Sequence, residues 1–336
     1  MFKKKRFLYM GFLLLPILGV WTVGVGAADI GMIKSWQIIL GHLGLLSYQP
    51  TAAEDAIIWS LRLPRVILAM TVGGGLAVCG GVLQTFFRNA LADPYIIGVS
   101  SGAALGSSIA VAFAGSLGLF TRPLLAFIFS FMTVLVVYGI SRRNQHVSST
   151  TLLLVGVALA SFLTSIMTFI LIYNPKHISN MYFWLLGSLS TASWLNLLIV
   201  LPLIIVGVVI LISFSRYLNA MLFGSITAQH LGVPVETVKK LILFLTALVV
   251  AGCVAACGPI GFVGLIIPHV VRLITGPDNS ILLPVSFWLG ALFLLFADTA
   301  ARTLFAPLEI PIGAITAICG APFFIYLVKR RKFNNY

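Results

Sequence analysis

The residues of this chain whose types could do chemistry are few and widely spaced. Asp298 and Arg302 stand four residues apart within an apolar segment, which places both on one face of a helix. This spacing predicts a structural ion pair, and a proton relay is the alternative because acids inside apolar spans are often functional. No Gly-x-x-x-x-Gly-Lys-Ser/Thr loop occurs, so we do not expect this chain to hydrolyse ATP by itself. No set of titratable groups converges at one depth, and we expect no catalytic residue.

The cysteines do not form a recognisable site. All four lie in apolar segments and lack the spacing of a disulfide framework or a zinc site: Cys79, Cys253, Cys257 and Cys319. We interpret them as small buried hydrophobic residues. Cys253 and Cys257 share a helix face, which leaves a soft-metal contact as the alternative. The sequence otherwise predicts no metal site and no cofactor in this chain.

The amino-acid composition indicates that membrane-spanning segments position these residues. Of the 336 residues, 60% are hydrophobic and 9% are charged, which is too little polar surface to cover a soluble globule of this size. Apolar runs of about 18 residues or more recur along the chain, and each is long enough to cross a bilayer as a helix. The short alternating segments typical of a membrane β-barrel are absent. We therefore predict an all-α, polytopic membrane protein in which residues 1–336 form a single transmembrane domain.

About ten transmembrane helices are predicted. Their ranges are 7–27, 65–87, 96–115, 121–141, 150–173, 193–214, 237–257, 260–275, 281–303 and 310–328. The eighth is short, follows Gly258-Pro-Ile-Gly261 and contains Pro268, so a broken or re-entrant helix with nine full crossings is the alternative. Small residues in the second and third spans, such as Gly80 and Gly102, favour close packing of helix backbones.

Basic residues set the predicted orientation. With the N-terminus on the cytoplasmic side, 15 of the 21 Lys and Arg residues fall inside, which is the bias that the positive-inside rule describes. We therefore place both termini in the cytoplasm and the protein in the plasma (inner) membrane. The net charge of +13 follows from this topology, so binding to nucleic acid is not expected. The first segment also resembles a cleavable leader, and that alternative would leave nine spans.

The outer side holds two connections with the composition of interfacial helices. Residues 31–46 are rich in apolar side chains, and residues 175–187 include the aromatic pair Tyr182 and Trp184, which suits the membrane interface. The outer side also carries three arginines against the positive-inside trend, Arg62, Arg65 and Arg302, and this exception requires a reason.

Several motifs together resemble the permease (transmembrane) subunit family of iron-siderophore, haem and vitamin B12 ABC importers. They are, in chain order, Arg62-Leu-Pro-Arg65, Gly80-Gly-Val-Leu-Gln84, Asn89-Ala-Leu-Ala-Asp-Pro94, Gly98-Val-Ser-Ser-Gly102, Trp184-Leu-Leu-Gly-Ser188, Leu231-Gly232-Val233, Gly258-Pro-Ile-Gly-Phe-Val-Gly-Leu-Ile-Ile-Pro-His269, Ala297-Asp-Thr-Ala-Ala-Arg302 and Pro311-Ile-Gly-Ala314. The resemblance covers residues 60–328. One departure is Ala90, where the family usually has proline, and it leaves the turn at residues 89–94 open.

The resemblance implies a vitamin B12-importer-permease-like fold and a homodimer with the translocation path at its interface. It also implies two cytoplasmic ATPase subunits, which carry the ATP and Mg, and an extracytoplasmic substrate-binding protein. Iron-siderophore is the expected cargo, and the same architecture carrying haem, cobalamin or an oxyanion such as molybdate is the alternative. A secondary transporter is the alternative class, but the coupling-ion sites that it needs are not visible within the spans.

Residue roles on the cytoplasmic side follow from matching positions. The loop from Leu218 to Pro234 resembles the coupling helices that contact the ATPase, and a plain connector is the alternative. Its contact residues would be Gly224, Ala228, Leu231 and Gly232. Four further residues resemble the cytoplasmic gate: Asn89, Leu91, Ser149 and Thr150. Ser149 and Thr150 are equally well placed to cap the fifth helix.

The three outer arginines match family positions that receive glutamates of the binding protein. A guanidinium group suits this role because its planar fork holds a carboxylate through two hydrogen bonds. The resemblance therefore implies that Arg62, Arg65 and Arg302 form the docking site. The alternative is that Arg302 pairs with Asp298, while the other two arginines anchor a helix end at the lipid headgroups.

Overall fold

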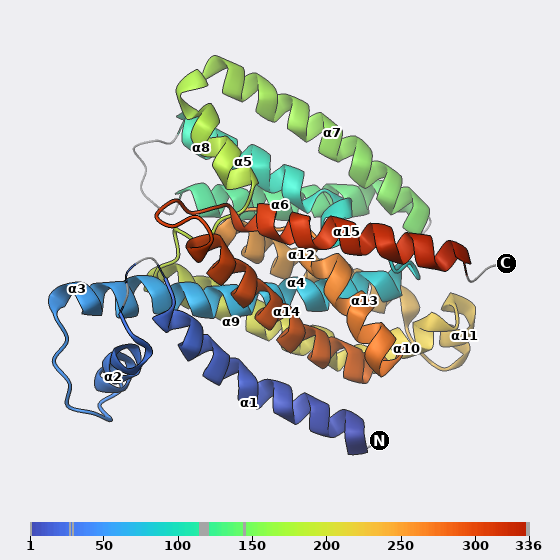
Figure 1. Cartoon of the computed structure of the whole chain (residues 1–336). Helices are drawn as coiled ribbons and strands as arrows, with labels where there is room; N and C mark the ends of the chain where they lie inside the picture. The colour runs from blue at the N-terminus through green and yellow to red at the C-terminus, as the bar shows by residue number, and fades with distance from the viewer. Residues whose placement is uncertain (1, 27, 29, 114–120, 144–145, 334–336) are drawn as a thin grey trace.

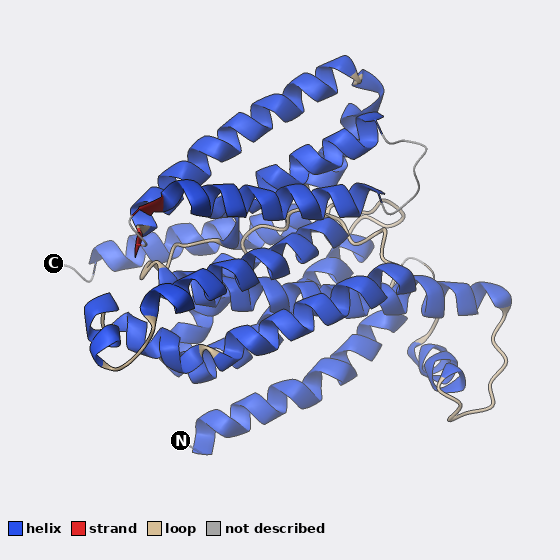
Figure 2. Cartoon of the chain, turned by 180° about the vertical axis from the view of Figure 1, so that it is seen from behind, coloured by secondary structure: helices blue, strands red, loops and turns tan. Residues whose placement is uncertain are grey.

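The computed structural model describes residues 2–26, 28, 30–113, 121–143 and 146–333. These residues form a bundle of helices with one very short hairpin (Figures 1 and 2). In chain order the elements are α1 Phe2–Gly24, α2 Met32–His42, α3 Ala52–Asp55, the π-helix η1 Ala56–Arg62, α4 Leu63–Phe86, the 3-10 helix η2 Pro94–Ile97, α5 Val99–Phe113, α6 Thr121–Ser141, β1 Arg142–Arg143, β2 His146–Val147, α7 Ser149–Tyr173, the 3-10 helix η3 Pro175–His177, α8 Ile178–Leu185, α9 Trp194–Ser213, α10 Ser215–Leu222, α11 Ser225–His230, α12 Val235–Cys257, α13 Val263–Thr275, α14 Asn279–Thr303 and α15 Ile312–Phe333. The all-α prediction is confirmed.

Each of the ten predicted spans falls on one helix, in order: α1, α4, α5, α6, α7, α9, α12, α13, α14 and α15. Within the described residues, six helices are long and apolar enough to cross a membrane: α4 with its extension from residue 52, α6, α7, α9, α12 and α14. The other four have shorter apolar parts: Leu14–Gly24, Val99–Phe113, Val263–Thr275 and Ile312–Tyr326. Ten crossings therefore stay a prediction, whereas the helical nature of all ten segments is established.

Helix α4 lies at the centre of the bundle, and nearly all of its residues are buried. It packs against α14, α13, α12 and α9. Glycines allow this packing, because a β-carbon on Gly73 would collide with the backbone of Gly290, and one on Gly80 with the backbone of Gly264. In a membrane, where burial from water does not drive helices together, such close approach supplies the attraction. The packing role predicted for Gly80 is confirmed.

The chain is irregular between α12 and α13, where the sequence predicted a broken helix. Phe262 has a left-handed backbone, φ +70, and α13 begins only at Val263. The hydroxyl of Tyr95 accepts a hydrogen bond from the Ile260 amide at 3.0 Å and donates one to the Ile260 carbonyl at 3.2 Å. Non-helical backbone at membrane depth needs such protein partners. Pro268, by contrast, lies inside a continuous α13.

The two connections that were predicted to lie on the outer side contain helices, as expected. Helix α2 occupies residues 32–42 and α8 occupies residues 178–185. The second span, however, extends farther outward than predicted, since α3 and η1 continue directly into α4. Thr51 starts this extension with a capping box to Glu54. Helix α1 begins and α15 ends at the same end of the bundle, which also holds α10 and α11, while α2, α3 and α8 lie at the opposite end (Figure 1).

Candidate functional site

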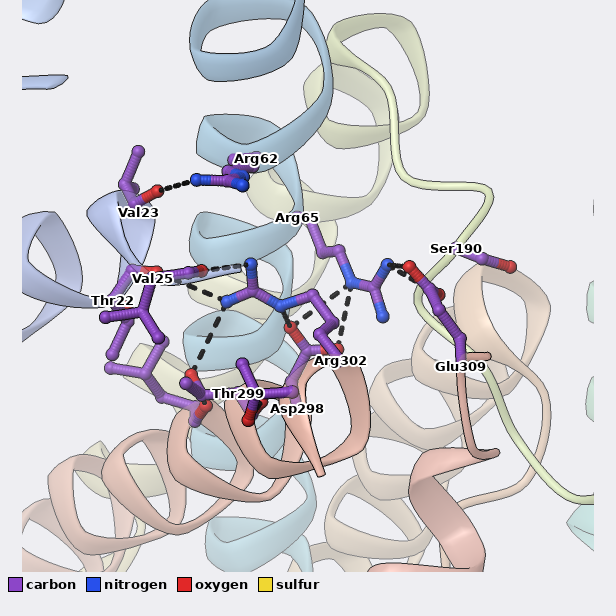
Figure 3. Close-up of polar contacts among 12 residues, drawn as sticks. Thr22, Val23, Val25, Arg62, Arg65, Ser190, Asp298, Thr299, Arg302 and Glu309 are labelled. Atoms are coloured by element: carbon purple, nitrogen blue, oxygen red, sulfur yellow. Dashed lines mark hydrogen bonds and ion pairs between the residues drawn. The ribbon is translucent and has the colours of Figure 1, made fainter. Parts of the chain in front are cut away.

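The three predicted arginines meet at the end of the bundle that is predicted to face outward, although they are far apart in the sequence (Figure 3). Arg62 ends η1, Arg65 lies in the first turn of α4, and Arg302 lies in the last turn of α14. Helix α4 packs along α14, and this contact brings the groups together. We call the three arginines with Asp298 and Glu309 the outer arginine cluster.

Asp298 is the buried centre of this cluster. Arg65 Nε donates to both of its carboxylate oxygens, at 2.9 and 3.2 Å, and Arg302 Nε lies 3.1 Å from Asp298 Oδ2. The Asp298 side chain has no exposed surface, and the two guanidinium groups supply the opposite charge that a buried carboxylate requires. The predicted ion pair between Asp298 and Arg302 is confirmed. The second partner, Arg65, is 233 positions away and was not predicted.

Glu309 closes the cluster on its exposed side. Both of its carboxylate oxygens accept hydrogen bonds from Arg65 Nη1, at 3.0 and 2.9 Å. The Glu309 side chain is 46% exposed, whereas that of Arg65 is 11% exposed. Arg65 is therefore held between one buried and one exposed carboxylate, and Glu309 is the member of this pair that solvent or a partner can reach.

Arg62 and Arg302 fasten the end of α1 to the core. Each guanidinium group donates to backbone carbonyls near the C-terminus of α1, where helix carbonyls have no partner within the helix and carry partial negative charge. The hydrogen bonds are Arg62 to Val23 at 3.1 Å and Ala28 at 2.7 Å, and Arg302 to Val25 at 3.0 Å and Thr22 at 3.3 Å. Both residues are buried: Arg62 is 7% exposed and Arg302 is 6% exposed.

These contacts bear on the predicted docking role. The structure places the three predicted residues near one another, but the guanidinium groups of Arg62 and Arg302 already have internal acceptors. The Arg62 guanidinium donates to carbonyls at the end of α1 and just beyond it, and anchoring at the headgroups stays the alternative. A cavity of about 390 Å³ lies beside the cluster and is lined by Arg65, Glu309, Ser190 and neighbours. The docking role stays a prediction. Of the three arginines, Arg65 is the most exposed.

The predicted gate residues lie in the turn after α4 and at the start of α7. After α4, the Asn89 side chain accepts the Leu91 amide at 2.9 Å, so an asparagine turn forms although Ala90 replaces the usual proline. Leu91 is exposed. Ser148, rather than Ser149 or Thr150, caps α7, since its hydroxyl accepts the Thr151 amide. The capping alternative is therefore wrong for Ser149 and Thr150, which occupy the first two positions of α7. Their gate role stays a prediction.

The predicted coupling loop contains α10 and α11. Gly224 and Gly232 have positive φ angles of 107° and 80°, which permits the sharp turns on either side of α11. Ala228 is fully buried, so it holds α11 against the bundle and is not available for contact. Three large apolar side chains project outward from this loop: Phe223, Ile226 and Leu231. The sequence prediction named only Leu231 among them, although apolar residues in a connection on the basic side were a readable signal.

Helix α7 lies at the margin of the bundle and exposes most of its surface (Figure 1). Four hydroxyl side chains follow one face of it at helical spacing: Ser161, Thr164, Ser165 and Thr168. Each hydroxyl donates to a carbonyl one turn earlier in α7, at 2.8 to 3.1 Å. The helix therefore presents polar oxygen atoms without leaving unpaired hydroxyl donors in an apolar medium.

The described residues hold no group of three or more His, Cys, Asp or Glu side chains that could bind a metal ion. Cys253 and Cys257 are buried, and the Cys257 thiol donates to the Cys253 carbonyl at 2.9 Å. Cys79 is buried as well, so these three residues fit the interpretation as small buried hydrophobic residues, whereas Cys319 is exposed and the interpretation is wrong for it.

Long apolar helices, with charged clusters only near their ends, define a multi-pass membrane protein. Residues 14–330 match the FecCD transport family, and the chain belongs to this family. It is a permease subunit of an ABC importer of the FecCD type, not an enzyme. The family resemblance inferred from the sequence motifs is confirmed.

Individual relatives differ in what they transport. The chain is 40% identical to the cobalamin import system permease of Halobacterium salinarum, over 88% of this chain and 79% of the relative. It is 38% identical to the molybdate import system permease of Haemophilus influenzae, over 96% of both. A solved structure described as an inward-facing, metal-chelate type ABC transporter has a TM-score of 0.83 at 34% identity, covering 97% of this chain and 99% of that one.

Proposed function

We propose that this chain forms, as a homodimer, the translocation path of a binding-protein-dependent ABC importer for a metal chelate, with an iron-siderophore as cargo. The observation that carries the proposal is the likeness, along 97% of the chain, to the metal-chelate type transporter. The iron-hydroxamate permease of Bacillus subtilis, 34% identical over 95% of both chains, supports the siderophore. Cobalamin and molybdate are second candidates because their permeases are 40% and 38% identical to this chain. Haem is a third, since a hemin permease of Yersinia pestis is 36% identical.

In this proposal, α7 forms part of the wall of the path. Its exposed hydroxyl face offers weak, evenly spaced hydrogen-bond acceptors and no fixed charge. Such a surface lets a polar chelate pass without binding it tightly, so selectivity resides largely in the binding protein. At the inner end, Asn89, Leu91, Ser149 and Thr150 close the path against the second subunit.

The ATPase partners would dock on the cytoplasmic loop through Phe223, Ile226 and Leu231. Support comes from their exposure on a short helical turn that is anchored by buried Ala228. When ATP binding draws two ATPases together, this loop would move with them, and the helices attached to it would rock so that the path opens to one side at a time. Both termini, at the same end of the bundle, would lie in the cytoplasm.

The binding protein would dock at the opposite end, on the outer arginine cluster. Arg65 and Glu309 form the accessible contact, whereas Arg62 and Arg302 hold the surrounding backbone in place. Arg65→Glu should therefore weaken association with the binding protein at least tenfold and reduce its salt dependence. Lys34→Glu, which changes an exposed outer residue paired with Glu54, is the matched control. Equal affinity of Arg65→Glu and the control would refute the docking assignment.

The function as a whole is tested by reconstitution. The permease, co-expressed with the ATPase and binding protein encoded beside it, is placed in proteoliposomes, and uptake of a ferric hydroxamate, cobalamin, haemin and molybdate is compared. We expect uptake of the ferric hydroxamate that requires both ATP and the binding protein. Uptake of another of these compounds alone would overturn the cargo, and failure to assemble with any ATPase would overturn the importer.

A further inference from the structure

Arg122 is an arginine in an unfavourable position. It is the second residue of α6, an apolar helix whose N-terminal end carries partial positive charge and disfavours a cation. In the proposed orientation it also lies on the outer side, against the positive-inside trend. Its partners within the described chain are a hydroxyl, a thioether and an indole ring, and none is a carboxylate. A charged residue in an energetically unfavourable position of this kind indicates a role in function.

The contacts of Arg122 with the described residues fix its side chain and leave part of its guanidinium group without an oxygen acceptor among them. Nε donates to Ser107 Oγ at 2.7 Å, and the guanidinium carbon lies 5.1 Å from the centroid of the Trp184 ring. The Met181 sulfur, 4.0 Å from Nη2, is a weak acceptor. Nη1 and Nη2 therefore have no oxygen acceptor among the described residues. The cation–π contact with Trp184 fixes the orientation of the guanidinium group.

These free donors border a cavity of about 310 Å³ between α6, α8 and the segments that precede α9 and α15. The hydroxyls of Ser188, Ser190 and Thr191 also line it. Glu309 is its acidic member, but both Glu309 oxygens are held by Arg65. Ser190 and Glu309 also line the cavity beside the outer arginine cluster, so the two cavities adjoin. Figure 3 shows Ser190 across from Glu309 and Arg65.

We propose that Arg122, with the hydroxyls of Ser188, Ser190 and Thr191, forms a subsite for an anionic oxygen group of the cargo. The chemical class is an iron chelate whose ligand presents negatively charged oxygens, such as those of hydroxamate, carboxylate or catecholate groups. A guanidinium fork binds two such oxygens at once. The hydroxyls of Ser190 and Thr191 donate to others, while Ser188 donates to Ser190 Oγ at 2.9 Å and orients it. The proposal rests on the proposed import function. A cargo released beside the outer arginine cluster would meet this subsite first, and anionic chelates would be favoured over neutral ones.

Binding of citrate to the permease alone, in nanodiscs, tests the subsite. Citrate is the carboxylate probe, and Trp184 fluorescence reports binding beside its ring. We expect Arg122→Gln to weaken binding at least tenfold, which is about 1.4 kcal/mol, and Arg122→Lys to weaken it less because the charge remains. Lys176→Gln, an exposed basic residue just before α8, is the matched control and should bind citrate normally. Trp184→Phe should remove the signal.

Equal citrate affinity of Arg122→Gln and the wild-type permease would overturn the proposal. A lower dimer fraction in Arg122→Gln would also overturn it, since Arg122 would then be a subunit contact. In proteoliposomes, Arg122→Gln should raise the KM for a carboxylate-bearing ferric chelate. If no chelate is transported by the wild-type complex, the proposed function fails, and citrate binding to the isolated permease still decides the subsite.

Discussion

Replacing Asp298 by asparagine removes one negative charge from the outer arginine cluster and leaves the shape of the side chain almost unchanged. The carboxylate has no exposed surface and lies within 3.2 Å of nitrogens of both Arg65 and Arg302. Once it is neutral, two buried cations lose their common counter-ion. Removing one partner of a buried ion pair costs about 3–5 kcal/mol, chiefly because the remaining charge is uncompensated. Glu309 still holds Arg65, so we expect the lower end, about 3 kcal/mol.

Glu309→Gln is the matched control for this prediction. Its carboxylate binds the same arginine, but the side chain is 46% exposed and water can replace it. An ion pair at the surface contributes about 0–1 kcal/mol. Both substitutions remove one negative charge from Arg65, but Asp298→Asn does so at a buried site and also removes the counter-ion of Arg302. Asp298→Asn should therefore destabilise the protein at least three times as much.

Thermal unfolding of the purified permease in one detergent, at one scan rate, measures this difference. Asp298→Asn should lower the apparent Tm several times more than Glu309→Gln. Adding Arg65→Gln to Asp298→Asn should recover part of the loss, because one of the two uncompensated cations is removed and the sites are coupled. Equal Tm values for Asp298→Asn and Glu309→Gln would refute the reasoning.

Three further predictions concern packing, coupling and gating. Gly80→Ala should destabilise the protein by about 1–3 kcal/mol in unfolding assays, because its β-carbon meets the α13 backbone, whereas Gly139→Ala, with open space around it, should be neutral or stabilise by up to about 1 kcal/mol. Gly232→Val should leave the permease inserted but lower transport-linked ATP hydrolysis, because a branched residue strains the backbone at φ +80 and displaces the coupling loop; unchanged coupling would count against that loop. Single cysteines at Leu91 and at Thr150 should each form a disulfide with the same position of the second subunit in a nucleotide-dependent way, and absence of both in every state would move the gate elsewhere.

The spans could be predicted because lipid leaves the chain few options. Backbone groups inside a bilayer must be paired within a segment, so each long apolar run has to be a helix. The ends of the helices were predicted less accurately than their existence, because polar side chains determine where a helix begins. Thr51 and Glu54 form a capping box that extends the second span outward, and this pair is visible in the sequence. The contact between Tyr95 and Ile260 was not predictable, because nothing local in the sequence indicates the pairing.

The outer arginines show the same limit. Helical spacing was sufficient to pair Asp298 with Arg302, since four residues make one turn. It could not show that Arg65 shares that carboxylate, or that Arg62 bonds to the end of α1, because both contacts depend on how separate helices pack. A docking role inferred from position alone therefore assigned one role to three arginines whose surroundings differ.

The ion pair between Arg65 and Asp298 also has a consequence for biosynthesis. The ribosome makes the two residues 233 positions apart, and at roughly 5–20 residues per second the second follows the first by about 10–50 s. Throughout that interval, the outer end of α4 carries a cation whose counter-ion does not yet exist. Because an unpaired charge is costly in lipid, we expect the nascent chain to keep this end in water or in the insertion machinery. The arrival of α14 would then be the step that allows α4 to take its final depth.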